Sequence, residues 1–190
     1  MDKLFSKIKT PIWFMRQAGR YLPEYKKLRS TEKTFLNLCF NSEKAAKISL
    51  QPLERFDVDF IILFSDILVV PHALGQFVDF KENIGPVLEP INNKFELDHT
   101  KLNKNLKMLD PVFKTIKIIK ETNKEKNLIG FCGGPFTVLT YMIEGGTSKT
   151  HEKVKLKIKK EKKQLQEIIE ILIEFSSMYL IEQIRSGANV

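Results

Sequence analysis

The sequence predicts an α/β fold, in which helices cover the faces of a parallel sheet. Short apolar runs, such as residues 60–64 (FIILF), have the length of strands that are buried on both faces. Longer segments between such runs place apolar residues at helical spacing, as Leu165, Ile168, Ile169 and Leu172 do. Strands that alternate with helices form a parallel sheet, because each helix returns the chain to the same end of the sheet.

The first half of the chain supplies two predicted strands and a helix between them. Residues 11–15 form an apolar run that predicts the first strand. Asn41 or Ser42 is placed to cap a helix that runs to about residue 56. Residues 60–64 predict the next strand, and the prolines and glycines of residues 71–90 predict a loop.

The second half predicts a helix, a strand, two more helices and the start of a last strand, at residues 110–126, 128–132, 136–143, 152–186 and 188–190. Asp110 is expected to cap the first of these helices, with Pro111 at its first position. Gly187 is expected to end the last helix. These elements make about three strand–helix units, whereas a closed barrel of eight needs roughly 250 residues. The 190 residues therefore predict either part of a barrel or a complete open sheet.

The net charge of +8 comes mainly from lysine, since five of the 31 basic residues are arginine. The lysines are expected to solvate helix surfaces, although their charge also favours an acidic substrate. Neither nucleic acid nor a membrane is an expected partner. Two cysteines and three histidines stand in no metal or redox spacing, so no metal site is expected. With no stretch apolar enough to cross a membrane, the expectation is a cytoplasmic protein.

Residues 11–20 (PIWFMRQAGR) are the most informative segment of the sequence. Arg16 and Arg20 lie in it and Arg29 follows closely, in a chain that otherwise uses lysine. Arginine is needed where a planar fork must hold a carboxylate or phosphate through two hydrogen bonds. Gly19 would allow a sharp turn or the close approach of a ligand. Structural ion pairs are an equally good interpretation of Arg16 and Arg20 at this point.

Asp66 directly follows the predicted strand at residues 60–64. A carboxylate at this position either caps the following loop, which is the commoner role, or faces a pocket. The pocket becomes the better interpretation if arginines converge on the same place, because an ionised aspartate complements a cationic centre within a polyanionic ligand.

A glycine-rich segment, residues 129–137 (IGFCGGPFT), precedes Tyr141. Glycines between a strand and a helix can expose backbone N–H groups to an anion. Their spacing matches neither a Walker loop nor a dinucleotide fingerprint. Tyr141 is either an ordinary core aromatic or an anchor for a ligand carboxylate.

Together these segments resemble the uroporphyrinogen decarboxylase family. Residues 11–20 match the family signature P-x-W-x-M-R-Q-A-G-R at each characteristic position, and residues 21–25 (YLPEY) continue the match. Residues 63–71 (LFSDILVVP) and 130–146 (GFCGGPFTVLTYMIEGG) follow in the family's order. The similarity extends from about residue 11 to residue 190.

The resemblance implies a (β/α)8 TIM barrel, of which residues 1–190 would be about the first half of a single, incomplete domain. Family members act without a cofactor, as homodimers. They convert the four acetate side chains of uroporphyrinogen III to methyl groups, giving coproporphyrinogen III in haem biosynthesis. The remaining strands would lie beyond Val190, so the activity of this chain alone stays open.

The resemblance also implies site residues. Arg16 and Arg20 would bind substrate carboxylates, with the wall of the same pocket shaped by Gln17, Ala18 and Gly19. Asp66 would be the catalytic anion, accepting hydrogen bonds from pyrrole N–H groups and stabilising the cationic ring, and Tyr141 would contact the substrate nearby. Two alternatives stay open: a corrinoid-linked methyltransferase on the same fold, which would use zinc, and an inactive fragment that binds acidic ligands.

Overall fold

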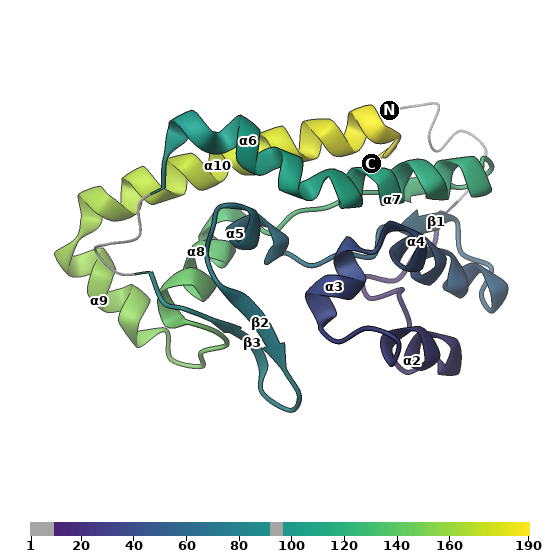
Figure 1. Cartoon of the computed structure of the whole chain (residues 1–190), viewed down its shortest axis with the longest axis horizontal. Coiled ribbons are helices and arrows are strands. Elements are labelled where there is room, and N and C mark those ends of the chain that lie inside the picture. Colours follow the sequence, from purple (N-terminus) through teal and green to yellow (C-terminus); the bar gives the residue numbers. More distant parts are fainter. Residues whose placement is uncertain (1–9, 92–96) are drawn as a thin grey trace. The chain divides into compact units, whose positions relative to one another are not determined.

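The computed structural model describes residues 10–91 and 97–190 (Figure 1). This part of the chain divides into two compact units. The first unit runs through Ser65 and resumes at Pro111–Phe131 and Ile181–Val190. The second comprises Asp66–Asp110 and Cys132–Leu180.

The first unit combines short helices with a small parallel sheet. Two of its helices begin where the sequence supplies a capping oxygen: the Thr34 hydroxyl accepts from the Asn37 N–H at 3.1 Å, and the Asn41 side chain from the Lys44 N–H at 3.2 Å. Its elements are α2 (Pro23–Arg29), α3 (Phe35–Phe40), α4 (Ser42–Leu50), the 3₁₀ turn η1 (Gln51–Glu54), β1 (Phe60–Ile62), nearly all of α7 (Asp110–Thr122), and β4 (Asn127–Ile129).

Strands β1 and β4 run parallel, with Phe60 opposite Asn127 and Ile62 opposite Ile129. The pairing continues beyond β1, because the Leu63 N–H donates to the Ile129 carbonyl at 3.0 Å. The predicted parallel arrangement is confirmed for this pair of strands. Buried side chains of α4, α7 and both strands form the core of the unit, among them Ala45, Ile48, Ile61, Ile116, Ile119 and Leu128.

Residues 188–190 lie beside β4, where the sequence predicted that a further strand begins. The Asn189 N–H donates to the Leu128 carbonyl, and the Gly130 N–H donates to the Val190 carbonyl, both at 2.8 Å. Successive residues of a strand direct their backbone groups to opposite edges. Because β1 uses Ile129, these bonds lie on the other edge of β4.

The predicted first strand at residues 11–15 is wrong. Ile12 makes one backbone bond to the sheet region, accepting from the Asp59 N–H at 2.9 Å, while its own N–H donates to the Asp59 carboxylate at 2.6 Å. The chain then turns at Met15 and Arg16 instead of extending the ladder. An apolar run was therefore insufficient to predict a strand here.

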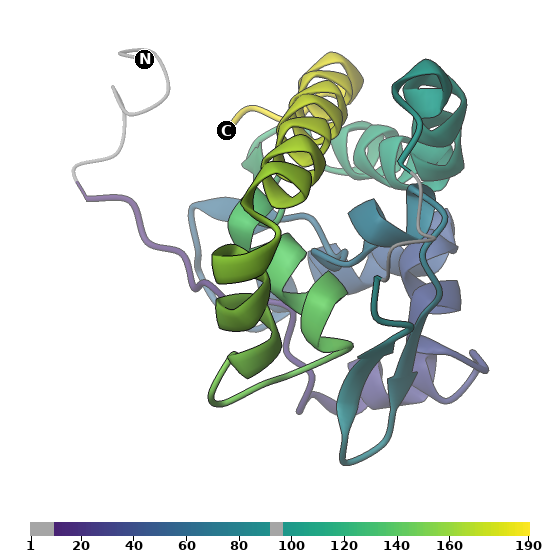
Figure 2. The same ribbon diagram turned by 90° about the vertical axis from the view of Figure 1, so that its left-hand side faces the viewer.

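The second unit contains most of the remaining helices and a β-hairpin. The predicted loop at residues 71–90 is wrong, since it holds a helix and the two antiparallel strands of the hairpin (Figures 1 and 2). The elements of this unit are α5 (Val69–Ala73), β2 (Val78–Lys81), β3 (Gly85–Leu88), η2 (His99–Lys101), α6 (Leu102–Leu106), η3 (Lys107–Leu109), α8 (Pro135–Glu144), α9 (Glu152–Lys160) and all but the end of α10 (Lys162–Ser186).

The hairpin is fixed at both ends. At its tip, Asn83 and Gly85 adopt positive φ angles of 61° and 93°, which reverse the chain direction. At its base, the Leu88 N–H donates to the Gly145 carbonyl at 3.0 Å, and the buried Gln76 side chain donates to the Met142 carbonyl at 3.2 Å. The hairpin is thus attached to the end of α8.

Several helix boundaries differ from those predicted. Asp110 is not a cap, because η3 leads directly into α7 and leaves Asp110 with a helical backbone. Helix α7 ends at Thr122 rather than residue 126, where the Asn123 side chain accepts from the Lys126 N–H at 2.9 Å and forms a local turn. The helix predicted at residues 152–186 is interrupted at Glu161, whose φ and ψ of −131° and 38° separate α9 from α10.

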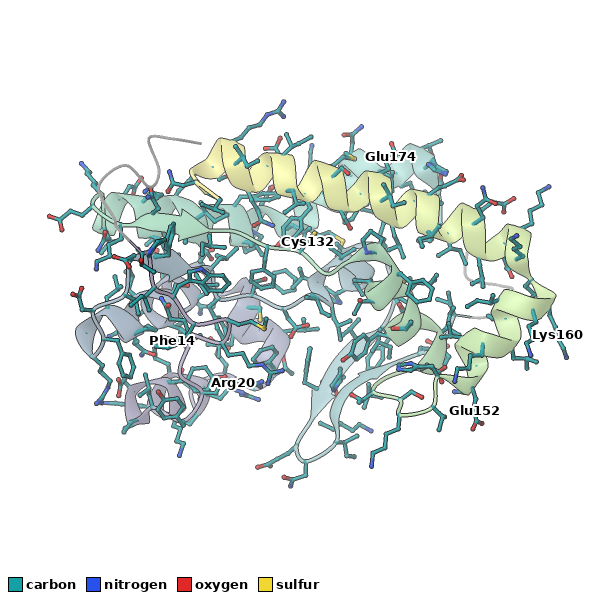
Figure 3. All side chains as sticks on the ribbon, turned by 180° about the vertical axis from the view of Figure 1, so that it is seen from behind. Phe14, Arg20, Cys132, Glu152, Lys160 and Glu174 are labelled. Carbon is teal, nitrogen blue, oxygen red and sulfur yellow. The ribbon has the colours of Figure 1, made fainter. Side chains whose placement is uncertain are left out.

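Helix α9 presents lysines to solvent, as predicted for the lysine-rich part of the chain. Lys155, Lys159 and Lys160 are exposed, whereas Val154 is buried. Figure 3 marks the two ends of this helix by Glu152 and Lys160. Among the helices of the described residues, none has both the length and the apolar character that crossing a membrane requires.

Candidate active site

The arginine-rich segment lines a pocket in the first unit. A cavity of about 180 Å³ is bordered by Phe14, Arg16, Gln17, Tyr21 and Phe56. The rings of Phe14 and Phe56 meet edge to face, with their centroids 6.3 Å apart. Aromatic side chains and a guanidinium therefore surround one space, a combination that suits a flat organic ligand carrying an anionic group.

The side chain of Arg16 is exposed. In the part of the chain that the structure describes, its side chain makes no hydrogen bond or ion pair. A free guanidinium beside a cavity retains its full capacity for a two-pronged contact with a carboxylate.

Three other arginines are already bound within the protein. Arg55 grips the Glu24 carboxylate through two bonds, Nε to Oε1 at 2.6 Å and Nη2 to Oε2 at 3.0 Å. Arg29 donates to the Glu32 carbonyl at 2.7 Å, and Arg185 donates to the Glu182 carboxylate at 2.6 Å. Structural pairing thus accounts for these arginines. It does not account for Arg16 or Arg20, which form no ion pair with any described residue.

Arg20 lies over an aromatic ring rather than beside an acid. Its guanidinium carbon is 5.1 Å from the centroid of Phe35 (Figure 3 labels Arg20). Phe35 in turn packs edge to face against Phe64, and Phe64 against Tyr25, at centroid distances of 5.8 and 6.0 Å. This cation–π contact restrains the guanidinium while leaving its N–H groups available to an anion.

Gly19 has a packing reason to be glycine. A Cβ atom at this position would lie 2.5 Å from Cγ of the buried Leu22 side chain. The backbone N–H of Leu22 donates to the Gly19 carbonyl at 2.8 Å. The sharp turn proposed for Gly19 is therefore present, and it leads directly into α2. Ala18, beside it, is partly buried.

Gln17 is buried, and its side chain holds backbone groups. Its Nε2 donates to the Phe60 carbonyl at 2.7 Å, and its Oε1 accepts from the Phe14 N–H at 3.3 Å. The first residue of β1 and the arginine-rich segment are joined through this one amide.

Asp66 belongs to the second unit and stabilises the start of α5. Its Oδ1 accepts from the Leu68 N–H at 2.8 Å, and its carbonyl accepts from the Val69 N–H at 3.4 Å. The capping role considered for Asp66 is thus present. The carboxylate stays partly exposed, and its acceptor capacity exceeds one hydrogen bond.

The loop after Asp66 contacts the glycine-rich segment that leads to Tyr141. A Cβ atom on Gly133 would lie 2.8 Å from Cβ of Ile67 and 2.6 Å from Cγ2 of Val138, so glycine is required for this close approach. Tyr141 lies two turns into α8 and is half-buried. Its hydroxyl bonds to no other described residue.

The thiol in the glycine-rich segment is not activated. Cys132 is half-buried, and burial raises the pKa of its thiol. A search of the described residues finds no group of three or more His, Cys, Asp or Glu side chains placed to hold a metal ion.

The predicted site residues are distributed between the two units. Arg16 and Gln17 line one pocket in the first unit. Arg20, which follows closely in sequence, stacks over the ring of Phe35. Asp66 and Tyr141 belong to the second unit. The sequence did not indicate that Phe14 and Phe56 would border the pocket; Phe14 lies inside the motif, but Phe56 carries no pattern that predicts its position.

Comparison with known proteins agrees with the motifs. Residues 7–190 match the family model described as uroporphyrinogen decarboxylase (URO-D). Uroporphyrinogen decarboxylases of Rickettsia canadensis and Rickettsia rickettsii (strain Sheila Smith) are 46% and 47% identical to the chain over 183 residues, covering 96% of it. The same alignments cover 54% and 53% of those relatives, so the chain spans about half their length.

A solved structure supports the fold. A methyltransferase from Methanosarcina mazei matches with a TM-score of 0.66 at 20% identity, over 85% of this chain and 48% of its own. The described residues show no closed barrel, but this likeness and the family match together indicate a TIM-barrel-like α/β fold. With a family model that matches nearly its whole length and relatives of such high identity, the chain belongs to the uroporphyrinogen decarboxylase family.

Proposed function

We propose that the whole protein is a cofactor-independent carboxy-lyase that converts the four acetate side chains of uroporphyrinogen III to methyl groups, giving coproporphyrinogen III in haem biosynthesis. The observation that carries this proposal is the state of Arg16 and Arg20. Neither has an ion-pair partner among the described residues, whereas Arg29, Arg55 and Arg185 are bound within the protein. Unpaired guanidinium groups beside aromatic rings suit a cyclic ligand with several carboxylates.

The proposed reaction needs an electron sink that the substrate itself supplies. Protonation of the ring carbon next to the acetate group converts an electron-rich pyrrole into a cation. The bond between the methylene and the carboxylate then breaks, CO₂ leaves, and the electron pair enters the ring system and cancels the charge. A second proton adds to the exocyclic carbon and gives the methyl group, while the ring gives up a proton.

Within this proposal, Asp66 is the fixed anion that stabilises the cationic ring. A preorganised charge at the place where opposite charge develops is often the largest single contribution to catalysis. Arg16 and Arg20 bind substrate carboxylates, Ala18 and Gly19 form the wall beside them, and Tyr141 offers a phenol to the substrate. Family membership and the separate local environments of these residues support the assignment.

Family membership also supports a homodimer located in the cytoplasm, with neither nucleic acid nor a membrane as partner. Size-exclusion chromatography with light scattering on the whole protein tests the homodimer, and the expected mass is twice that of one whole polypeptide.

A product assay tests the proposed activity. The whole protein is incubated with uroporphyrinogen III under reducing conditions, and coproporphyrinogen III is measured by chromatography. The Arg16→Lys variant should lose activity by roughly 10- to 100-fold, since one charge-assisted contact contributes about 1.5–3 kcal/mol. Arg185→Lys is the matched control, because Arg185 pairs with Glu182 on the exposed end of α10. A folded protein without product, or equal activity of both variants, contradicts the proposal.

A further inference from the structure

Gln17 lies inside the arginine-rich segment, yet its side chain faces away from solvent. The residue is 6% exposed, although it borders the same pocket as Arg16. Its amide makes one bond as a donor, to the Phe60 carbonyl, and one as an acceptor, from the Phe14 N–H. Both partners are backbone groups, so the amide of Gln17 joins the start of β1 to the arginine-rich segment.

The direction of the backbone shows which groups Gln17 binds. Phe60 lies an odd number of residues from Leu63, whose N–H bonds β4, so the Phe60 carbonyl points to the opposite edge of β1. The arginine-rich segment meets the chain here twice, because the Asp59 N–H donates to the Ile12 carbonyl at 2.9 Å and the Gln17 amide bonds the next residue, Phe60. Between Ile12 and Gln17 the chain turns outward, and Met15 is 83% exposed at the turn. Without Gln17, the Phe60 carbonyl and the Phe14 N–H would lose these partners at a partly buried site.

The turn between the two anchored points carries Arg16. Phe14 is held through its N–H, and Gln17 is held through its side chain, so the two residues between them form a clamped loop. A long arginine side chain loses substantial rotational freedom when it binds a ligand. Fixing the backbone on both sides of Arg16 lowers the part of that loss that comes from the loop.

We propose that Gln17 is a positioning residue, whose amide joins the Phe60 carbonyl to the Phe14 N–H and thereby holds the Arg16 turn beside the pocket. This inference rests on the proposed role of Arg16 as a binder of substrate carboxylates. It differs from a direct contact between Gln17 and substrate, because the amide would have to give up a buried bond to the Phe60 carbonyl and a partly buried bond from the Phe14 N–H to reach a ligand.

A double-mutant cycle separates the two roles. Gln17→Met keeps the length of the side chain and removes both hydrogen bonds, and it should weaken binding of uroporphyrinogen III by the whole protein roughly tenfold. In an Arg16→Lys background the same change should weaken binding by less than about twofold, because the group that Gln17 positions is gone. Equal fold-losses in both backgrounds overturn the proposal.

Hydrogen exchange and a second variant keep the test independent of folding. The Phe14 amide should exchange faster in Gln17→Met, while amides in β4 stay as protected as before; unchanged Phe14 protection overturns the proposal. Gln17→Glu retains the acceptor for Phe14 and regains a donor for Phe60 only when protonated. Its binding, relative to wild type at each pH, should therefore recover as pH falls from 7.5 to 5.5, and a constant or falling ratio contradicts the role.

Substrate binding by the two variants distinguishes the role of Arg16 from that of Gln17. If Arg16→Lys binds as tightly as wild type, the proposed function of Arg16 is wrong, whatever Gln17 does to the Phe14 amide. If Arg16→Lys binds weakly but Gln17→Met binds normally, Arg16 keeps its role and the positioning by Gln17 is wrong.

Discussion

The side-chain amide of Gln183 brackets the backbone of Phe131. It donates to the Phe131 carbonyl at 2.9 Å and accepts from the Phe131 N–H at 3.0 Å. Gln183 lies near the end of α10 and is 1% exposed, while Phe131 follows β4. One buried side chain thus ties the last turn of a helix to the end of the strand that leads into the glycine-rich segment.

Replacing Gln183 by leucine should destabilise the protein. Leucine is similar in size to glutamine, but it leaves two backbone groups of Phe131 without these partners, at an expected cost of about 1–3 kcal/mol in the free energy of unfolding. Urea unfolding followed by circular dichroism measures the difference. Gln166→Leu is the matched control, because Gln166 is exposed on the same helix and bonds only a neighbouring side chain, that of Glu170. Equal effects of the two substitutions would mean that the Phe131 contact contributes nothing.

Gly130 depends on the same contact. A Cβ atom at Gly130 would collide with Oε1 of Gln183 and would lie 3.3 Å from Cβ of Ala188. Gly130→Ala should therefore cost about 1–3 kcal/mol of stability, as overpacking of a buried site does. In a Gln183→Ala background the same substitution should cost much less, since the colliding oxygen is absent. Additive losses in the two backgrounds would show that Gly130 is required for another reason.

These contacts illustrate which parts of the structure the sequence could predict. The strand at Phe60 was predictable because its residues are mostly buried and appear as a continuous apolar run, whereas in β4 Leu128 alone is fully buried. The hairpin at residues 78–88 was not predictable, since proline and glycine predicted a loop while the turn at Asn83 supported two strands. Nothing local distinguishes Gln183 from Gln164 and Gln166 of the same helix, which are not buried, because the partner of Gln183 is 52 residues away.

The candidate site shows the same limit. Residue types alone indicated that Arg16 and Arg20 were unusual in a lysine-rich chain, and the absence of ion pairs in the described residues agrees with that. The sequence left open whether Asp66 caps a turn, and the geometry shows that it does. The backbone-binding role of Gln17 depends on a contact with Phe60, 43 residues away, a tertiary feature that no local pattern encodes.

The Glu24–Arg55 pair should respond to acid. The hydrogen bond from Arg55 lowers the pKa of the Glu24 carboxyl below its ordinary value. A lowered folded-state pKa stabilises the protein above the ordinary pKa of glutamate, and that contribution disappears as pH falls through the lowered value. Arg55→Met should return the Glu24 pKa toward the ordinary range of about 4, measured by NMR titration. Because the pair is exposed, its effect on stability should be small and salt-sensitive. An unshifted Glu24 titration in the variant would contradict the pairing.

Asp66 offers a substitution that separates charge from capping. In Asp66→Asn the amide oxygen can still accept from the Leu68 N–H, so the start of α5 should remain stable. What is lost is the negative charge proposed to face the cationic pyrrole. Turnover of uroporphyrinogen III by the whole protein should fall by roughly 10²–10³, while substrate affinity changes by only a few-fold.

Asp98 supplies the control for this prediction, because its Oδ1 accepts from the N–H two residues later, that of Thr100, at 2.9 Å, as Asp66 does from Leu68. Asp98→Asn should leave turnover unchanged, since the same kind of turn is kept and no substrate contact is proposed there. If Asp66→Asn turns over substrate at the wild-type rate, Asp66 is a capping residue and the anion must be another group. If both variants lose turnover together with thermal stability, the loss reflects folding. If the charge of Asp66 acts in catalysis, turnover should fall strongly in Asp66→Asn but not in Asp98→Asn, and the melting temperature should stay unchanged.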